Sequence, residues 1–119
     1  MLPRLRACAI ELFTRAHDAG CTTSLDTNWD PSERWAGLQE LLAVTDVFLP
    51  NTAELLAISG CSDVEAAAAV LRAQAPELTL VVKQGSDGAS AWGPDDLRAN
   101  VAAITVDAVD TTGAGDLFA

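Results

Sequence analysis

The sequence predicts an α/β fold in which helices pack on a layered, mostly parallel sheet. Segments with helical spacing of apolar residues alternate with short apolar runs that are typical of strands. Each of the first three apolar runs is followed at once by a polar cluster, as expected at the carboxyl ends of strands in open α/β sheets. The chain has 119 residues, 50% of them hydrophobic, which suits one compact domain over residues 1–119.

Four helices are predicted from apolar spacing together with a start or stop signal. The signals are a glycine or proline stop, or a capping pattern with an acidic residue at the third position. The helices are residues 2–16 before Gly20, the segment Trp35–Leu42 after the cap Asp30–Glu33, residues 51–59 before Gly60, and the alanine-rich segment between the capping box Ser62–Glu65 and Pro76.

Five short runs are predicted as strands: residues 22–25, 46–49, 78–82, 89–92 and 101–106. Residues 78–82 are apolar without interruption, as expected for a strand that is buried on both faces. Turns that contain glycine, at residues 83–88 and 93–96, separate the last three strands.

The charge balance argues against nucleic acid as a partner. Seven Lys and Arg against 17 Asp and Glu give a formal net charge of −10, and scattered cations cannot form the basic stripe that a phosphate backbone needs. Small anions are not excluded, because backbone N–H groups at a helix start can hold them. No apolar stretch is long enough for a membrane span, and the basic start, cut by Glu11, does not resemble a signal peptide.

The cysteines indicate a reducing, cytoplasmic environment. Cys8, Cys21 and Cys61 are odd in number and lack Cys-x-x-Cys spacing, so we expect buried free thiols. With one histidine there is no zinc set, and we expect His17 to be a surface residue of the first helix. The side chains expected to pack rather than to stack on a base are Trp29, Trp35 and Trp92.

The polar clusters behind the strands are candidates for a ligand site. Asp26 and Asn28 follow the first strand, Asn51 follows the second, and Lys83–Gly88 follows the third. Because ligands in open α/β sheets lie outside the carboxyl ends of strands, the three clusters could line a single crevice. Asp30 already serves as a predicted helix cap, and a structural role is favoured for Asp26, Asn28 and Asp30 over contact with substrate or magnesium.

The final segment carries the strongest chemical signal. Gly113-Ala114-Gly115 predicts a flexible turn into a helix that begins near Asp116, where small residues let backbone N–H groups face an anion. Asp116 could accept a proton from an attacking hydroxyl, and anion donors beside a base are what phosphoryl transfer to an alcohol requires. On spacing alone, the same residues also fit a plain glycine-rich helix entry with a first-turn acid.

Three motifs, in this order along the chain, resemble those of one enzyme family. Asn51-Thr52-Ala53-Glu54 resembles the Asn-x-x-Glu motif of the ribokinase-like (PfkB) carbohydrate kinases, and Lys83–Gly88 resembles their nucleotide loop. Asp110–Phe118, which reads DTTGAGDLF, resembles their C-terminal signature. The resemblance covers essentially the whole chain but only the later portion of a full member. It implies a three-layer αβα, Rossmann-like fold, incomplete at both ends, and thus a partial kinase domain.

The resemblance implies ATP-dependent phosphoryl transfer to a hydroxyl of a sugar or sugar-like substrate. Asp116 would be the catalytic base, and Gly113, Ala114 and Gly115 would form the anion hole for the γ-phosphate. The residues that would border the nucleotide are Lys83, Gln84, Gly85, Ser86, Asp87 and Gly88.

Metal ions are implied in the same way. Asn51 and Glu54 would organise the Mg²⁺ and phosphate region through water, with Asn51 also near the nucleotide. Asp110 and Thr112 would give oxygen ligands to a monovalent cation, K⁺, since hard cations prefer oxygen. The resemblance is compatible with a homodimer of the complete protein.

Other interpretations of these residues stay open. Asn51 and Glu54 also fit an N-cap pair, and Lys83 fits a solvated charge at a strand end. The chain has nothing that resembles the family's N-terminal sugar pocket and β lid, and it stops three residues after Asp116, so we expect little or no kinase activity from this polypeptide alone.

Two other functions are weighed against the kinase. A non-catalytic nucleotide- or partner-binding module of kinase descent is the alternative. A dinucleotide-binding oxidoreductase is disfavoured, because the sequence has neither G-x-G-x-x-G after the first strand nor a P-loop.

Overall fold

The computed structural model describes residues 3–27, 35, 37–107 and 109–119. Asn28, Trp29 and the predicted cap Asp30–Glu33 lie outside the described residues. The helices are α1 (Pro3–Asp18), α2 (Leu38–Leu42), α3 (Thr52–Ser59), α4 (Val64–Gln74) and α5 (Ala114–Phe118). The strands are β1 (Ser24–Leu25), β2 (Val47–Phe48), β3 (Thr79–Lys83), β4 (Ala89–Trp92) and β5 (Arg98–Val101), with a 3₁₀ turn, η1, at Gly85–Asp87.

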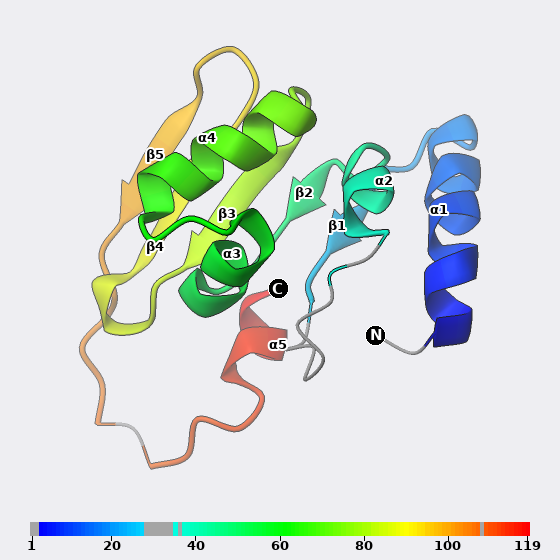
Figure 1. The fold of residues 1–119 in the computed structure, drawn as a ribbon. Coiled ribbons are helices and arrows are strands. Elements are labelled where there is room, and N and C mark those ends of the chain that lie inside the picture. The colour runs from blue at the N-terminus through cyan, green and yellow to red at the C-terminus, as the bar shows by residue number, and fades with distance from the viewer. Residues whose placement is uncertain (1–2, 28–34, 36, 108) are drawn as a thin grey trace.

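The five described strands form one sheet in the order β1-β2-β3-β4-β5 (Figure 1). β1, β2 and β3 pair in parallel, and β4 and β5 extend the sheet as antiparallel neighbours. Two reversals leave β5 running in the direction of β3, so the sheet is mostly parallel, as predicted. The strand predicted at residues 101–106 is wrong in its bounds. The tight turn after Gly93 brings the chain back into the ladder by Arg98, opposite Trp92.

One face of the sheet carries the hydrophobic core. Leu25, Phe48 and Leu80 are partners in register on the three parallel strands, and all three are buried. They lie in one cluster with buried side chains of α2, α3 and α4, and Figure 1 shows α3 and α4 lying across the sheet. Burial of this continuous apolar surface removes it from water and is the main favourable term in folding.

The other face of the sheet is open in the described part of the chain. Because side chains alternate between the faces, Val81 points away from the core, in register with Ala91 and Ala99. The prediction that residues 78–82 are buried on both faces is therefore wrong: Leu80 and Val82 are buried, whereas Val81 is half-buried. Small apolar side chains dominate this open face.

The helix ends follow the predicted signals with one correction. Gly20 and Gly60 both adopt the left-handed conformation just after α1 and α3, with φ of 78° and 70°. α4 begins one residue later than its predicted capping box, because the carboxylate of Asp63, not the hydroxyl of Ser62, accepts the N–H of Ala66 at 2.9 Å. A carboxylate near a helix start also interacts favourably with the helix dipole.

Two glycines in the hairpins have different roles. Gly88 has a φ of 94°, and a Cβ there would collide with the carbonyl oxygen of Val101, so the close approach of the chain after β5 requires glycine. The turn between β4 and β5 instead places Asp95 and Asp96 in the left-handed region, with φ of 54° and 57°. The N–H of Leu97 donates to the carbonyl of Pro94 at 3.0 Å, which closes a type I′ turn.

The remaining sequence expectations concern isolated side chains. The cysteines are free, as predicted, but the prediction that they are buried is wrong: Cys8 lies on the exposed side of α1, Cys21 follows the turn after that helix, and Cys61 is half-buried. His17 is a surface residue whose Nε2 lies 2.9 Å from Asp46 Oδ2. The two described tryptophans, Trp35 and Trp92, pack against the core.

None of the helices in the described residues combines the length and the apolar character that a membrane crossing would need.

Candidate functional site

The ends of the three parallel strands meet in one place. Lys83, at the end of β3, donates from Nζ to Asp26 Oδ2 at 2.6 Å, and Asp26 follows β1 directly. Asn51, after β2, forms a parallel bridge with Lys83, whose N–H donates to the carbonyl of Pro50 at 2.9 Å. The residues that follow the three parallel strands, Asp26, Asn51 and Lys83, thus lie together, and of these three only Lys83 lines the cavity described below.

Asn51 and Glu54 form a reciprocal capping box at the start of α3. The N–H of Glu54 donates to Asn51 Oδ1 at 2.9 Å, and the N–H of Asn51 donates to Glu54 Oε2 at 3.0 Å. The N-cap interpretation of this motif is therefore correct, and it fixes both side chains at the end of β2.

Glu54 is 3% exposed, and this burial raises its pKa above the ordinary value. The N–H of Asn51 and the ammonium of Lys83 act in the opposite direction, and the Asp26 carboxylate adds to the rise. The carboxyl of Glu54 is thus electrostatically coupled to the Asp26–Lys83 pair.

The segment after Lys83 is a tight turn held by its own backbone. The N–H of Asp87 donates to the carbonyl of Gln84 at 3.1 Å, and the N–H of Gln84 donates to the carbonyl of Gly88 at 2.8 Å. The hydroxyl of Ser90 donates to Gln84 Oε1 at 2.7 Å, so the amide of Gln84 is anchored to β4. Ser86 and Asp87 are exposed at the tip of η1.

The C-terminal motif forms two successive turns. The N–H of Thr112 donates to Asp110 Oδ1 at 2.8 Å, and this bond lowers the pKa of Asp110. Gly113 takes the left-handed conformation, with a φ of 76°, immediately before α5. The helix predicted to begin near Asp116 begins at Ala114, and Asp116 is exposed in its first turn.

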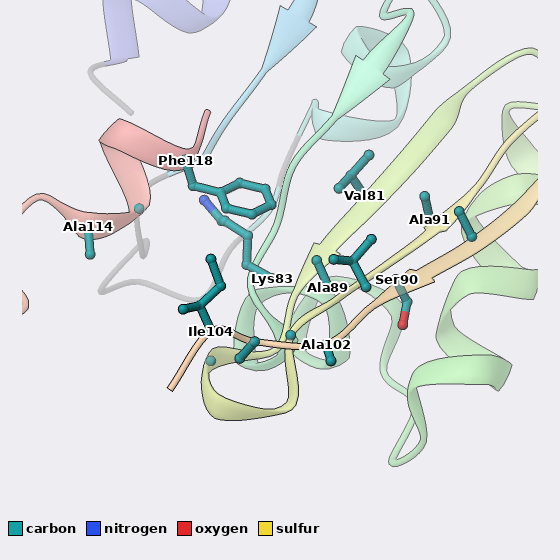
Figure 2. A pocket seen from close by; sticks show the side chains of 15 residues that line it. Val81, Lys83, Ala89, Ser90, Ala91, Ala102, Ile104, Ala114 and Phe118 are labelled. Carbon is teal, nitrogen blue, oxygen red and sulfur yellow. The ribbon is translucent and has the colours of Figure 1, made fainter. Parts of the chain in front are cut away.

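α5 returns to the strand ends. A Cβ at Gly115 would lie 3.6 Å from Lys83 Nζ, so the lysine ammonium is in contact distance of the glycine turn. Figure 2 shows the Lys83 side chain reaching toward this helix, with its nitrogen beside Phe118 in that view. The predicted nucleotide loop and the predicted anion hole, which residues 89–112 separate in the sequence, are thereby brought together.

A cavity of about 660 Å³ lies between α5 and the open face of the sheet. Side chains of β3, β4 and β5, the segment 102–104 and α5 line it, and the lining is mostly apolar (Figure 2). Among the described residues that line it, Lys83 is the one cation, and Gly85, Gly88, Ala114 and Gly115 contribute from the predicted site. Asp116 does not line this cavity, although the adjacent Gly115 does.

Two features of the site were not expected from the sequence. The ion pair between Asp26 and Lys83 joins residues 57 positions apart, and it is compatible with the structural role expected for Asp26. Ile104 and Phe118 form part of the apolar wall of the cavity. Apolar residues that follow the last strand could have indicated this wall, because they have no partner in the core. Ile104, for example, is 86% exposed.

Among the described residues, no group of three or more His, Cys, Asp and Glu side chains is arranged to hold a metal ion. The donors that come together are the carboxylates of Asp26 and Glu54, coupled through Lys83, and the Asp110–Thr112 turn. Mg²⁺ is commonly held by one or two carboxylates plus water and substrate phosphate. Glu54 is 3% exposed and already accepts the N–H of Asn51, so it suits contact with such an ion through water. The Asp110–Thr112 turn offers the oxygen atoms that a monovalent cation prefers.

The chain is similar to several known proteins. The family model for pfkB family carbohydrate kinases matches residues 3–119. The chain is 36% identical, over 111 residues, to an ATP-dependent ribose-1-phosphate kinase from Halopiger xanaduensis, covering 93% of this chain and 35% of that protein. It is 38% identical, over 119 residues, to a fructokinase from Klebsiella pneumoniae, covering 92% of this chain and 36% of that protein.

A solved structure gives the same architecture. Aminoimidazole riboside kinase from Salmonella enterica, complexed with aminoimidazole riboside and an ATP analogue, superposes with a TM-score of 0.78 at 30% identity. The alignment covers 92% of this chain and 38% of that one. The chain thus spans little more than a third of the length of the relatives it matches.

Proposed function

This chain belongs to the pfkB family of carbohydrate kinases, and on that premise we propose that its site serves ATP-dependent phosphoryl transfer to a hydroxyl of a sugar or sugar-like substrate. The observation that carries the proposal is the contact distance of 3.6 Å between the Lys83 ammonium and the Cβ position of Gly115. It places a cation from the strand ends beside a turn of small residues, and a cation next to a helix start suits transferring phosphoryl oxygens.

Asp116 is the proposed catalytic base. Its carboxylate takes the proton of the substrate hydroxyl while that oxygen attacks the γ-phosphorus of ATP, and the bond from the γ-phosphorus to the leaving oxygen of ADP breaks. Gly113, Ala114 and Gly115 hold the γ-phosphoryl oxygens. Asp116 lies in the first turn of α5, next to Gly115, which lines the cavity, and this adjacency supports the role.

The proposed nucleotide contacts are Lys83, the turn Gln84–Gly88 and Asn51. The turn is held by its own backbone bonds, so it is shaped before a nucleotide arrives. The apolar wall above it, with Val81 and Ala91, suits the flat surface of a base, and Lys83 marks the end at which phosphates would lie.

Two cations are part of the proposal. Asn51 and Glu54 would organise Mg²⁺ beside the phosphates through water, and Asp110 with Thr112 would hold K⁺ next to the glycine turn. When bound, such cations neutralise charge that develops on the phosphoryl oxygens. The capping box of Asn51 and Glu54 holds the Glu54 carboxylate in place in the absence of a cation.

We propose that the 119-residue chain alone transfers phosphoryl groups slowly, since it spans about a third of its relatives. A cytoplasmic location is part of the proposal, supported by the free cysteines. The direct test is to titrate the chain with ATP by calorimetry, and then to measure ADP release with ATP, Mg²⁺, K⁺ and a panel of sugars. We expect ATP binding with ADP release far below ordinary enzyme rates.

Each outcome of this test bears on a separate claim. Turnover at ordinary enzyme rates would show that the chain is active by itself. ATP binding with no sugar-dependent transfer, even after the chain is placed in a complete relative, would favour the alternative of a non-catalytic nucleotide-binding module. Absence of ATP binding at millimolar concentration would contradict the nucleotide site itself.

A further inference from the structure

We propose that Asp26 is a positioning residue that sets phosphate affinity: its carboxylate holds the Lys83 ammonium in the ligand-free chain, and an incoming polyphosphate takes Lys83 from it. The inference rests on the proposed function, because it assumes that Lys83 faces the phosphates. It adds a residue that follows β1, two strands before the nucleotide loop in chain order, and that lies outside the three motifs named in the sequence analysis.

The pair is more than a surface contact. Lys83 Nζ and Asp26 Oδ2 are 2.6 Å apart, at the short end for a charge-assisted hydrogen bond. The side chains of Lys83 and Asp26 are 15% and 23% exposed, although Asp26 as a whole residue lies at the surface, so water screens the pair in part. The interaction between the two charges is favourable, and an anion that takes Lys83 must compensate for the loss of this interaction.

The position of the ammonium makes that exchange feasible. Lys83 lines the cavity and lies in contact distance of Gly115, whereas Asp26 is not among the lining residues. The lysine therefore faces two ways: toward a carboxylate on the β1 side, and toward the glycine turn. A phosphate at that turn would meet the ammonium with only a small movement of its flexible stem.

The local charge balance sets the direction of the effect. Asp26 and Glu54 together oppose one ammonium, and both carboxylates repel an anion. Loss of the Asp26 charge leaves Lys83 without its carboxylate partner and removes one repulsion. Affinity for a metal-free polyphosphate should then rise, which is the opposite of what damage to a merely structural ion pair would produce.

The experiment measures the binding of tripolyphosphate, without Mg²⁺, to the 119-residue chain and its variants by isothermal titration calorimetry at low salt. We expect Asp26→Asn to lower Kd by about three- to tenfold. Lys83→Met should raise Kd by about tenfold or more, and Lys83→Arg should retain most of the affinity. Asp18→Asn, at the exposed end of α1, makes the same change in net charge and should have little effect. Thermal unfolding checks that each variant is folded.

The outcomes separate this inference from the proposed function. Wild-type binding with an unchanged or raised Kd in Asp26→Asn overturns the exchange and leaves the phosphate site intact. If Asp18→Asn lowers the Kd for tripolyphosphate as much as Asp26→Asn does, the effect is due to net charge, and this result also overturns the proposed exchange. Absence of tripolyphosphate binding to the wild-type chain contradicts the proposed phosphate site, and the exchange fails with it.

Discussion

Glu54 is the most deeply buried carboxylate of the site, and its surroundings show how a single residue can serve fold and function together. It accepts the N–H of Asn51 and so caps α3, but burial raises its pKa. A side chain used only as a cap would be equally effective at the surface. The buried position instead keeps a second carboxylate close to Asp26 and Lys83.

The raised pKa has a consequence for stability. The folded chain favours the protonated form of Glu54. The contribution of Glu54 to the free energy of unfolding is therefore fully present below the ordinary pKa of 4.5, and it is lost as pH rises through the raised pKa of the folded chain. Glu54→Gln removes this loss while keeping an acceptor for Asn51. In urea unfolding, the free energy of unfolding of Glu54→Gln, relative to that of the wild type, should rise from pH 4.5 to neutral pH. Glu77→Gln, at an exposed position, should show no such trend, and a flat difference for Glu54→Gln would contradict the assignment.

Residues of the site differ in how far the sequence predicts them. The pairing of Asn51 with Glu54 is local, because a cap and its third residue are always neighbours at a helix start, so spacing alone predicts it. The pairing of Asp26 with Lys83 depends on the order of the strands in the sheet. Composition and spacing contain no information on that order. The sequence therefore places Asp26 at the end of a strand but does not predict Lys83 as its partner.

At the scale of elements, the turn from β3 to β4 depends on Gly88. We expect Gly88→Ala to destabilise the chain by about 2–4 kcal/mol, because the methyl group collides with the Val101 carbonyl and the φ of 94° is unfavourable for alanine. Gly85→Ala is the matched control: it has a φ of 58° but open space, so only about 1 kcal/mol is expected. Urea unfolding measures both, and equal effects would contradict the close approach.

The turn from β4 to β5 offers a stabilising change. Asp96 has a φ of 57°, which is strained for a residue with a side chain. Asp96→Gly should raise the free energy of unfolding by about 0.5 kcal/mol, since glycine suits both central positions of a type I′ turn. Asp96→Ala keeps the strain and should lower the stability. A loss of stability in Asp96→Gly would show that the aspartate side chain stabilises the turn in another way.

Elements were predicted best where one signal marks both their type and their end. α3 and its Gly60 stop were predicted almost to the residue, because the cap, the apolar run and the glycine all agree. The bounds predicted for β5 are wrong because Arg98 and Asn100 are polar and Ala99 is small, and all three are exposed, so no apolar run marks this strand. Its pairing with β4 is set by the turn rather than by an apolar pattern.

At the scale of the whole molecule, the site exists because the sheet brings distant residues to one edge. Asp26, Asn51 and Lys83 end successive parallel strands, and α5 returns over the open face to place Gly115 beside them. The rule that ligands lie at the carboxyl ends of strands predicted the first three from sequence. The return of α5 was predicted only through resemblance to a family, because the loop before it has no periodic pattern.

The open face of the sheet is the part of the molecule that local reasoning described least well. A continuous apolar run predicts burial on both faces, yet Val81 lies at a cavity instead of in the core. The apolar run indicates that both faces of β3 are apolar, but it does not indicate which elements cover each face. A strand beside a ligand cavity and a strand beneath a helix therefore look alike in sequence.

The central claim is that Asp116 takes a proton from the attacking hydroxyl, and one measurement tests it most directly. Residues 3–119 replace the matching segment of the Klebsiella fructokinase, and kcat for ADP release is compared between this chimera and its Asp116→Asn variant. Asp107→Asn, exposed in the preceding loop, is the control. We predict that Asp116→Asn lowers kcat by about 10²–10⁴-fold while the Kd for ATP is unchanged. A kcat within a few-fold of the unsubstituted chimera would contradict the account.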